Sequence, residues 1–157
     1  MKIGILSDSH DNLVKLEKAV RFFNKNKVGF VLHAGDFIAP FALSKLENLK
    51  CNWRGVFGNN DGEKAGLLKR SAGKVAKGPL RITVYKRKIS LAHDINTVNL
   101  AKEKADLAAF GHTHKAQISK QGNTLIVNPG ECGGWLTGKS TVAIVNLATM
   151  SARIFKI

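Results

Sequence analysis

The first 57 residues of the chain repeat one pattern, a short apolar run followed by a segment with helical periodicity. The apolar runs are Lys2–Ser7, Val28–Ala34 and Cys51–Phe57, and each has the length of a buried strand. Between the runs, apolar residues recur at helical spacing: Leu13, Leu16, Val20 and Phe23, with Asp11 as the expected N-cap, then Ala42 or Leu43, followed by Leu46 and Leu49. Repeated strand–helix steps favour a parallel sheet with helices on its faces.

Beyond residue 57 the pattern is richer in strands. We expect helices over Gly62–Ala72 and Asn96–Lys104, and a basic hairpin turn at Lys86–Lys88. The segments that look like strands are Leu80–Tyr85, Lys88–His93, Asp106–Phe110, Ala116–Ser119, Thr124–Asn128, Ser140–Leu147 and Ala152–Ile157. Two packed mixed sheets covered by helices would accommodate them all. The prediction is one α/β domain over residues 1–157.

Composition indicates a basic globular protein. Apolar residues make up 44% of the chain, and the two cysteines, Cys51 and Cys132, form no CxxC pair. No apolar run approaches the ~20 residues that span a bilayer, so we expect a cytoplasmic protein without membrane contact. The net charge of +14 should attract anions, and nucleic acid is therefore a candidate partner. A basic surface kept for solubility explains the charge equally well.

Five short polar motifs follow the strand-type runs. In order, they are Asp8-Ser9-His10, Gly35-Asp36, Gly58-Asn59-Asn60-Asp61, His93 and Gly111-His112-Thr113-His114. Strand ends are where α/β proteins present their chemistry. Aspartate, histidine and asparagine together can bind a pair of divalent metals, and the nitrogen-rich set favours Mn, Fe, Co, Ni or Zn over Mg. Asp8 and His10 would point the same way if strand geometry continued through them, because side chains alternate along a strand.

Such a ligand set suits hydrolysis of a phosphate ester. A bound metal lowers the pKa of water, and two metals about 3.5–4 Å apart can hold both the attacking and the leaving oxygen. Each motif alone is a weak signal, because Asp or Asn beside glycine usually marks a turn. Five motifs in order, each at the end of a run, together indicate a metal site that cleaves phosphoesters.

The motif series resembles the calcineurin-like metallophosphoesterase superfamily, whose motifs run D-x-H, GD, GN-x-D, H and GH-x-H. Within it, the chain is similar to the small YfcE-like phosphodiesterases, especially archaeal ones. Further support comes from Gly58–Gly62 and from Asn128–Gly134. The resemblance spans nearly the whole chain. It implies a four-layer α/β/β/α sandwich of two mixed β-sheets flanked by helices, and a metal-dependent phosphodiesterase acting on small phosphodiesters or nucleotides.

The resemblance also implies roles for single residues. One metal would be held by Asp8, His10, Asp36 and His114, and the other by Asp36, Asn59, His93 and His112. Asp36 would then bridge the two metals, and a hydroxide shared by them would attack the phosphorus. We expect Mn²⁺, with Ni²⁺, Fe, Co²⁺ and Zn²⁺ as alternatives.

The residue after the motif asparagine departs from the superfamily pattern. Asn60 stands where many members have a histidine that assists the leaving group, and an amide cannot act as a general acid, a role worth ~10²–10⁴ in rate. We therefore predict weak turnover, best on diesters with acidic leaving groups. Asn60 and Asp61 are the predicted catalytic residues, with an anchoring or a turn role open for Asp61. Asn12 and Asn60 are the predicted substrate contacts.

Several residues and two other functions stay open. Asp94, where the superfamily commonly has glycine, would cap the next helix or orient His93, and capping is the preferred interpretation. His33 is interpreted as a packed residue or one that supports the ligands without binding the metal, and Trp53 and Trp135 as core or rim residues. A non-catalytic scaffold has a precedent in the eukaryotic retromer subunit of this fold. A nuclease would suit the charge, although related nucleases usually carry capping domains. A homo-oligomer also remains open.

Overall fold

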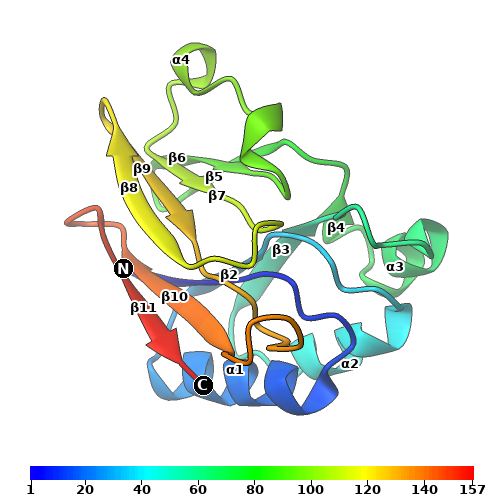
Figure 1. Cartoon of the computed structure of the whole chain (residues 1–157). Helices are drawn as coiled ribbons and strands as arrows, with labels where there is room; N and C mark the ends of the chain where they lie inside the picture. The colour runs from blue at the N-terminus through cyan, green and yellow to red at the C-terminus, as the bar shows by residue number, and fades with distance from the viewer.

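A six-stranded mixed sheet forms the centre of the molecule in the computed structural model, which describes all of residues 1–157. Its strand order is β11-β10-β1-β2-β3-β4 (Figure 1). The strands are β1 (Lys2–Leu6), β2 (Phe30–His33), β3 (Asn52–Val56), β4 (Val75–Ala76), β10 (Thr141–Asn146) and β11 (Ser151–Lys156). β1 to β4 pair in parallel, as the strand–helix repeats predict, whereas β10 and β11 pair antiparallel.

A second mixed sheet of five strands packs on the first, in the order β5-β6-β7-β9-β8. Its strands are β5 (Leu80–Val84), β6 (Arg87–Leu91), β7 (Leu107–Ala109), β8 (Gln117–Gln121) and β9 (Thr124–Asn128). The core between the sheets contains 15 buried apolar residues, among them Ile3 and Ile5 from β1 and Leu107 from β7. Side chains alternate along each strand, so one apolar face of each sheet meets the other.

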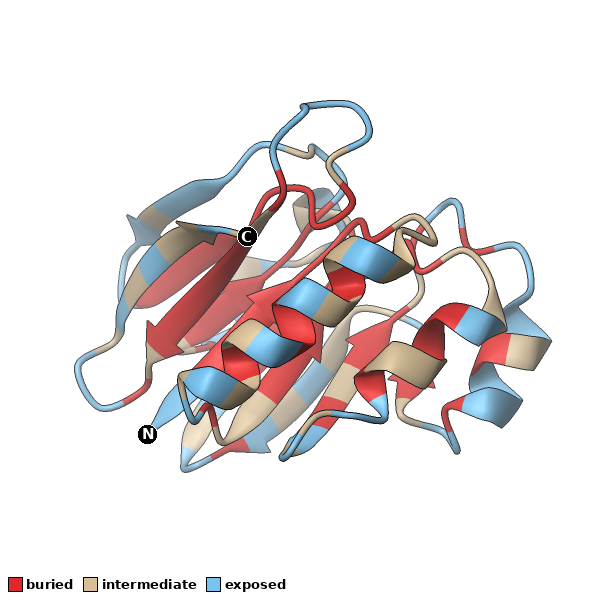
Figure 2. Cartoon of the chain, turned by 90° about the horizontal axis from the view of Figure 1, so that it is seen from below, coloured by how far each residue is buried: buried red, intermediate tan, exposed pale blue.

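Helices cover the outer face of the first sheet. They are α1 (Leu13–Lys25), the 3-10 helix η1 (Pro40–Ala42), α2 (Leu43–Leu46) and α3 (Lys64–Arg70). A core of 17 buried residues joins them to the sheet, and Figure 2 shows the buried stripe of α1 facing the strands. The outer face of the second sheet carries only η2 (Ile95–Thr97) and α4 (Leu100–Glu103), over a cluster of three buried residues. The α/β/β/α sandwich is confirmed, and its fourth layer is thin.

Two predicted helices differ from the structure in detail. Asn12, and not Asp11, is the N-cap of α1, because its side-chain oxygen accepts a hydrogen bond from the Lys15 N–H at 3.2 Å. The Asp11 carboxylate instead accepts from the Ala39 N–H at 3.1 Å. The single helix expected over Asn96–Lys104 is wrong, because Val98 has extended backbone angles that separate η2 from α4.

Two features of the strands also differ. The hairpin turn lies at Tyr85 and Lys86, which both have positive φ angles, and the predicted turn residues Arg87 and Lys88 belong to β6. Positive φ at both central positions suits the right-handed twist of a two-residue hairpin. The short strand β4 was not predicted, because two residues carry no periodic signal.

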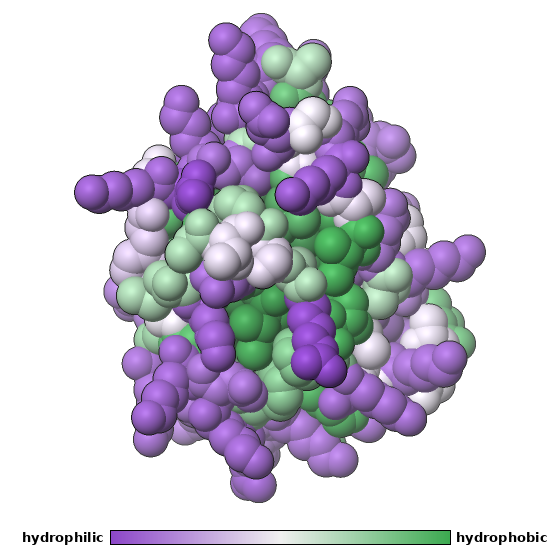
Figure 3. Space-filling model, turned by 90° about the vertical axis from the view of Figure 1, so that its left-hand side faces the viewer, coloured by the Kyte–Doolittle hydropathy of each residue, from purple (hydrophilic) through white to green (hydrophobic).

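One side of the molecule carries an apolar band. Figure 3 shows this band on the side of the molecule where β8 and β11 form sheet edges, framed by polar and charged side chains. None of the helices combines the length and apolar character that crossing a membrane requires. The cytoplasmic location stays a prediction.

Candidate metal centre

The five predicted motifs meet at one end of the sandwich. Parallel strands present their carboxyl ends at the same edge of a sheet, and β1, β2 and β3 deliver Asp8, Asp36 and Asn59 there. β6 and β7 are likewise parallel, and they are followed by His93 and Gly111–His114. The topology therefore brings together residues that are more than 100 positions apart in the chain.

In the loops at this edge, several residues other than glycine have left-handed backbone conformations. Positive φ angles occur at Asp8 (54°), His10 (43°), Asp36 (60°), His112 (67°) and His114 (58°). Strand geometry does not continue through Asp8 and His10, so the predicted reason for their common direction was wrong. The loop is instead held by the Asp8 N–H, which donates to the Gly35 carbonyl at 3.0 Å, and by the His10 N–H, which donates to the Asp36 carbonyl at 3.1 Å.

A first group of donors consists of Asp8, His10 and His114. Oδ1 of Asp8 lies 3.9 Å from Nε2 of His10 and 3.6 Å from Nε2 of His114. Asp8 is fully buried, and this burial raises the pKa of its carboxyl group, an effect that the Ser7 hydroxyl and nearby imidazoles only partly oppose. A buried carboxylate between two imidazole nitrogens is an arrangement that a cation would stabilise.

A second group of donors surrounds Asn59. Its Oδ1 lies 2.8 Å from Nε2 of His93 and 2.9 Å from Nδ1 of His112. The other ring nitrogen of His93, Nδ1, lies 2.8 Å from the Ala34 carbonyl and can bond to it only as a donor. In the neutral ring, Nε2 then carries the lone pair and faces the oxygen of Asn59. That tautomer and orientation are those of a metal-binding histidine.

Asp36 lies between the two groups. Its Oδ2 is 3.6 Å from Nε2 of His10 and 3.5 Å from Nε2 of His93. Asn60 contacts the same carboxylate twice, through its backbone N–H to Oδ1 at 2.9 Å and through Nδ2 to Oδ2 at 2.8 Å. The side-chain amide of Asn60 therefore points into the centre, as its predicted role requires.

Asp61 and Asn12, the other predicted catalytic and substrate residues, are engaged within the protein. The buried Asp61 carboxylate accepts hydrogen bonds from three backbone N–H groups, those of Asp36 at 3.2 Å, Ile38 at 2.7 Å and Gly58 at 2.8 Å. It ties the second motif to the third, which is the anchoring role. Nδ2 of Asn12 donates to the Gly133 carbonyl at 2.8 Å, while its oxygen caps α1. Substrate contact by Asn12 stays a prediction.

Two partners of the centre were not assigned a role from the sequence. Oε1 of Glu131 lies 3.5 Å from Nδ1 of His114, and the Asn128 amide donates to the Gly111 carbonyl at 2.8 Å. Burial favours a higher pKa for Glu131, but hydrogen bonds from Leu136 and Thr137 outweigh it and lower the pKa. Asn128 is the last residue of β9 and Glu131 lies in the loop that follows, and their Asn-Pro-Gly-Glu sequence was the available signal.

His33 supports the centre from behind and contacts none of the donors. It is fully buried and stacks on Phe37, with ring centroids 3.7 Å apart. Its Nδ1 accepts from the Gly35 N–H at 3.3 Å, so Nε2 carries the proton towards the Ser9 hydroxyl at 3.1 Å. That hydroxyl donates to the Asp36 carbonyl at 3.3 Å. Burial holds the pKa of His33 well below 6.5, and the prediction of a packed residue is confirmed.

The structure also places Asp94, the two tryptophans and Cys132, which were interpreted from the sequence. Asp94 caps η2 by accepting from the Asn96 N–H at 2.9 Å, as preferred. Trp53 belongs to the helix–sheet core, and the exposed Trp135 lies at the rim, where Nε1 donates to the His10 carbonyl at 3.1 Å. Cys132 is fully buried, and burial raises its pKa to about 12, so the thiol is inert.

The residues of the centre fit divalent cations. Three of its polar atoms are buried without any hydrogen-bond partner: Oδ1 of Asp8, Nε2 of His10 and Nδ1 of His114. Unpartnered buried polar atoms are costly, and two of these three are the atoms that a cation in the first group would bind. In the second group, a cation would likewise bind the lone pair on Nε2 of His93. The donor set is one that binds transition metals.

Comparison with known proteins supports this interpretation. Residues 1–150 match the calcineurin-like phosphoesterase superfamily domain. The chain is 36% identical over 154 residues to Phosphodiesterase MJ0936 of Methanocaldococcus jannaschii, covering 93% of each protein. A solved structure described as a novel archaeal phosphodiesterase has a TM-score of 0.92 and 32% identity, with both chains fully covered.

More distant structures share the fold alone. The phosphoesterase Yfce from E. coli has a TM-score of 0.66 at 17% identity, covering 100% of this chain and 98% of its own. Wild-type Vps29 from Entamoeba histolytica, solved with zinc, has a TM-score of 0.71 at 18% identity with the same coverage. On the family match and the archaeal relative together, this chain belongs to the calcineurin-like phosphoesterase superfamily.

Proposed function

We propose that this chain is a metal-dependent phosphodiesterase with a binuclear centre. The observation that carries the proposal is the position of Asp36, whose Oδ2 lies within 3.6 Å of His10 on one side and 3.5 Å of His93 on the other. A carboxylate between two separate donor groups is what a bridging ligand requires. The proposal is supported by the family match and by the relative from M. jannaschii, which is named a phosphodiesterase.

The proposed ligands divide as the two donor groups divide. Asp8, His10, Asp36 and His114 would hold one cation, and Asp36, Asn59, His93 and His112 the other. When bound, the two cations would supply positive charge to the phosphoryl oxygens and lower the pKa of water. We propose Mn²⁺ as the native metal because mixed nitrogen and oxygen ligands suit it, with Ni²⁺, Fe, Co²⁺ and Zn²⁺ as alternatives.

Asn60 and Asp61 contribute in different ways. The Asn60 amide, held at 2.8 Å from Asp36, can donate one hydrogen bond to a phosphoryl oxygen but has no proton to transfer at neutral pH. Asp61 fixes the backbone of Asp36 and Gly58 and so positions the centre. Without a general acid, the leaving group departs unprotonated. We therefore propose small phosphodiesters with acidic leaving groups as the favoured substrates.

The scaffold and nuclease alternatives are less well supported. Asp8 and Asp36 are both nearly fully buried within one cluster. Burying two like charges lowers the stability of the fold, and a protein that only binds partners gains nothing in return. The charge of +14 suits a nuclease, but charge alone specifies no partner.

Hydrolysis of bis-p-nitrophenyl phosphate by Mn²⁺-loaded protein tests the proposal. Asp36→Asn keeps the shape of the side chain and removes its charge, and it should abolish turnover and reduce bound metal. Asp106→Asn is the matched control. Asp106 lies outside the centre and forms an ion pair with Arg87, with 3.2 Å between their side-chain atoms. Turnover by the wild-type protein no higher than that of the Asp36→Asn variant would end the catalytic claim. Metal content of about one ion per chain would end the binuclear claim.

A further inference from the structure

A pocket of about 570 Å³ opens directly beside the second donor group. Asn59, His93 and His112 form one of its walls. The volume falls within the range of about 300–1,000 Å³ typical of small-molecule sites. Only one of its ten lining residues, Phe57, is hydrophobic, so the pocket is suited to a polar ligand. A substrate reacting at the centre would extend into this space.

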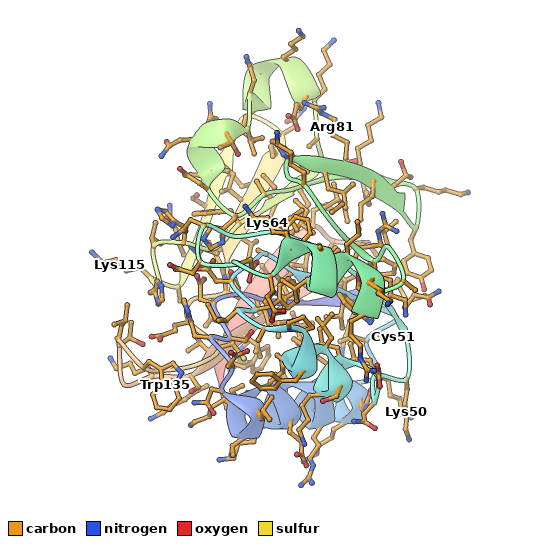
Figure 4. The ribbon with its side chains drawn as sticks, turned by 90° about the vertical axis from the view of Figure 1, so that its right-hand side faces the viewer. Lys50, Cys51, Lys64, Arg81, Lys115 and Trp135 are labelled. Carbon is orange, nitrogen blue, oxygen red and sulfur yellow. The ribbon has the colours of Figure 1, made fainter.

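Two lysines line this pocket beside the proposed metal ligands. Lys64 and Lys77 both line it, and neither forms an ion pair within the protein. Figure 4 shows Lys64 above helix α3, on the side towards the second sheet. The pocket contains one carboxylate, that of Asp94, which accepts the capping hydrogen bond from Asn96. Glu63, beside Lys64 in the chain, does not line the pocket.

A second cavity provides a useful contrast. It has a volume of about 240 Å³, lies on the second sheet and contains Arg81 and Glu103. These two side chains form an ion pair of 2.7 Å, so the positive charge there is already neutralised. The two lysines beside the centre have no such partner, and an anionic group is the ligand they lack.

From this arrangement we infer that the pocket is a subsite for a second anionic group of the substrate. The scissile phosphate lies at the centre, and a further phosphate on the same molecule contacts Lys64 and Lys77. The inference rests on the proposed function and names its substrate class, a phosphodiester that carries an additional phosphate. Such a group could be the terminal phosphate of a small nucleotide or the next phosphate of a strand, since both offer the same charge.

Product binding tests the subsite without requiring turnover. Thymidine 3′,5′-bisphosphate and thymidine 5′-monophosphate are titrated by calorimetry into Mn²⁺-loaded wild-type protein and into a Lys64→Gln/Lys77→Gln variant. We expect the bisphosphate affinity to fall about tenfold for each lysine removed, as for the loss of one charge-assisted contact. The monophosphate affinity should change less than about twofold. Lys18→Gln/Lys25→Gln, with both positions exposed on α1, is the matched control for the loss of two positive charges and should change neither affinity.

A trinucleotide of thymidylate separates the two sources of the second phosphate. If it binds more tightly than the bisphosphate, with the same dependence on the two lysines, a strand is the source; if it binds no more tightly, a terminal phosphate is. Equal losses of affinity for the monophosphate and the bisphosphate would overturn the subsite, because they would show only a general attraction of anions to positive charge. No loss for either ligand would overturn it as well.

The two proposals can fail separately. Failure to hydrolyse bis-p-nitrophenyl phosphate, with lysine-dependent bisphosphate binding intact, removes the catalytic function and leaves the subsite. Normal hydrolysis with lysine-independent binding removes the subsite and leaves the catalytic function.

Discussion

Replacing Gly58 with alanine should damage the centre, because the backbone of Gly58 packs directly on Asp36. A methyl group on Gly58 would lie 2.0 Å from Oδ1 of Asp36 and 2.5 Å from its backbone nitrogen, whereas ordinary van der Waals contact begins at 3.4 Å. The Asp36 carboxylate cannot simply turn away, since Asn60 holds both of its oxygens. Asp61 holds the backbone on both sides of the clash. Asp36 or the loop must therefore shift by more than an ångström.

The size of the effect can be worked out from this geometry. Overpacking of a well-packed site costs about 1–3 kcal/mol, and about 1 kcal/mol shifts the melting temperature of a chain of this size by roughly 2–4 °C. We expect Gly58→Ala to lower the melting temperature by about 2–12 °C. Displacing Asp36 should also weaken Mn²⁺ binding by about 10–100-fold, the usual effect of disturbing the support of a ligand.

Gly62→Ala is the matched control in the same motif. A methyl group there would meet nothing within 4 Å, and Gly62 has no positive φ angle. This substitution should stabilise the protein by about 0.4–1 kcal/mol, because it reduces the freedom of the unfolded chain. Both variants are measured by circular dichroism melts with and without Mn²⁺, and by calorimetric metal titration. Similar melting temperatures and metal affinities for the two variants would refute the reasoning.

Four further predictions concern the centre, its supporting residues and the two cysteines. Asp61→Asn removes the charge and replaces one of the two accepting oxygens with an NH2 donor, so at least one of the three N–H groups loses its acceptor. It should destabilise the fold by at least about 1.5 kcal/mol in urea titrations, since bonds to charged groups contribute about 1.5–3 kcal/mol each; an unchanged midpoint contradicts this. Asn60→His supplies an imidazole that can protonate a leaving group, so kcat on alkyl diesters should rise by up to ~10²-fold while p-nitrophenyl diesters gain less; equal gains contradict the missing general acid. The pKa of His33 is lowered by burial, so the unfolded chain takes up its proton first. The stability that neutral His33 provides is complete above about pH 6.5 and declines as the pH falls, and His33→Gln should flatten that decline between about pH 7 and about pH 5 in metal-free protein; an unchanged slope contradicts it. Burial raises the pKa of the partly exposed Cys51 and raises that of the fully buried Cys132 further, to about 12, so a thiol reagent should modify native protein at Cys51 and not at Cys132, as peptide mass spectrometry would show; modification of Cys132 before unfolding contradicts it.

The sequence located the centre because strand ends are visible as the ends of apolar runs. Once β1, β2 and β3 are expected to be parallel, Asp8, Asp36 and Asn59 must share one edge of a sheet. The position of His93, His112 and His114, which follow β6 and β7, was less evident, because the local sequence does not indicate which sheet a short strand joins. The motif order and the resemblance supplied that information.

What the sequence could not provide depends on contacts made across the fold. Glu131 approaches His114 only because β9 lies beside β7, and Asn12 has both polar atoms engaged only because the loop at Gly133 passes over it. The break in the helix expected over Asn96–Lys104 has a similar cause. Of residues 95–104, only Ile95 and Leu100 pack on the cluster of three buried residues, and so little apolar burial does not hold one continuous helix together.

The left-handed backbone conformation of five proposed ligands lowers the stability of the fold in order to place side chains that activity requires. Each such residue is strained by roughly 1 kcal/mol or more relative to glycine, which adopts this conformation freely. A library of variants screened for heat resistance alone should therefore enrich glycine at positions 8, 10, 36, 112 and 114, and the survivors would be robust but chemically inert. Under the proposed function, the strain at these positions is the stability lost in placing aspartate and histidine side chains at the centre.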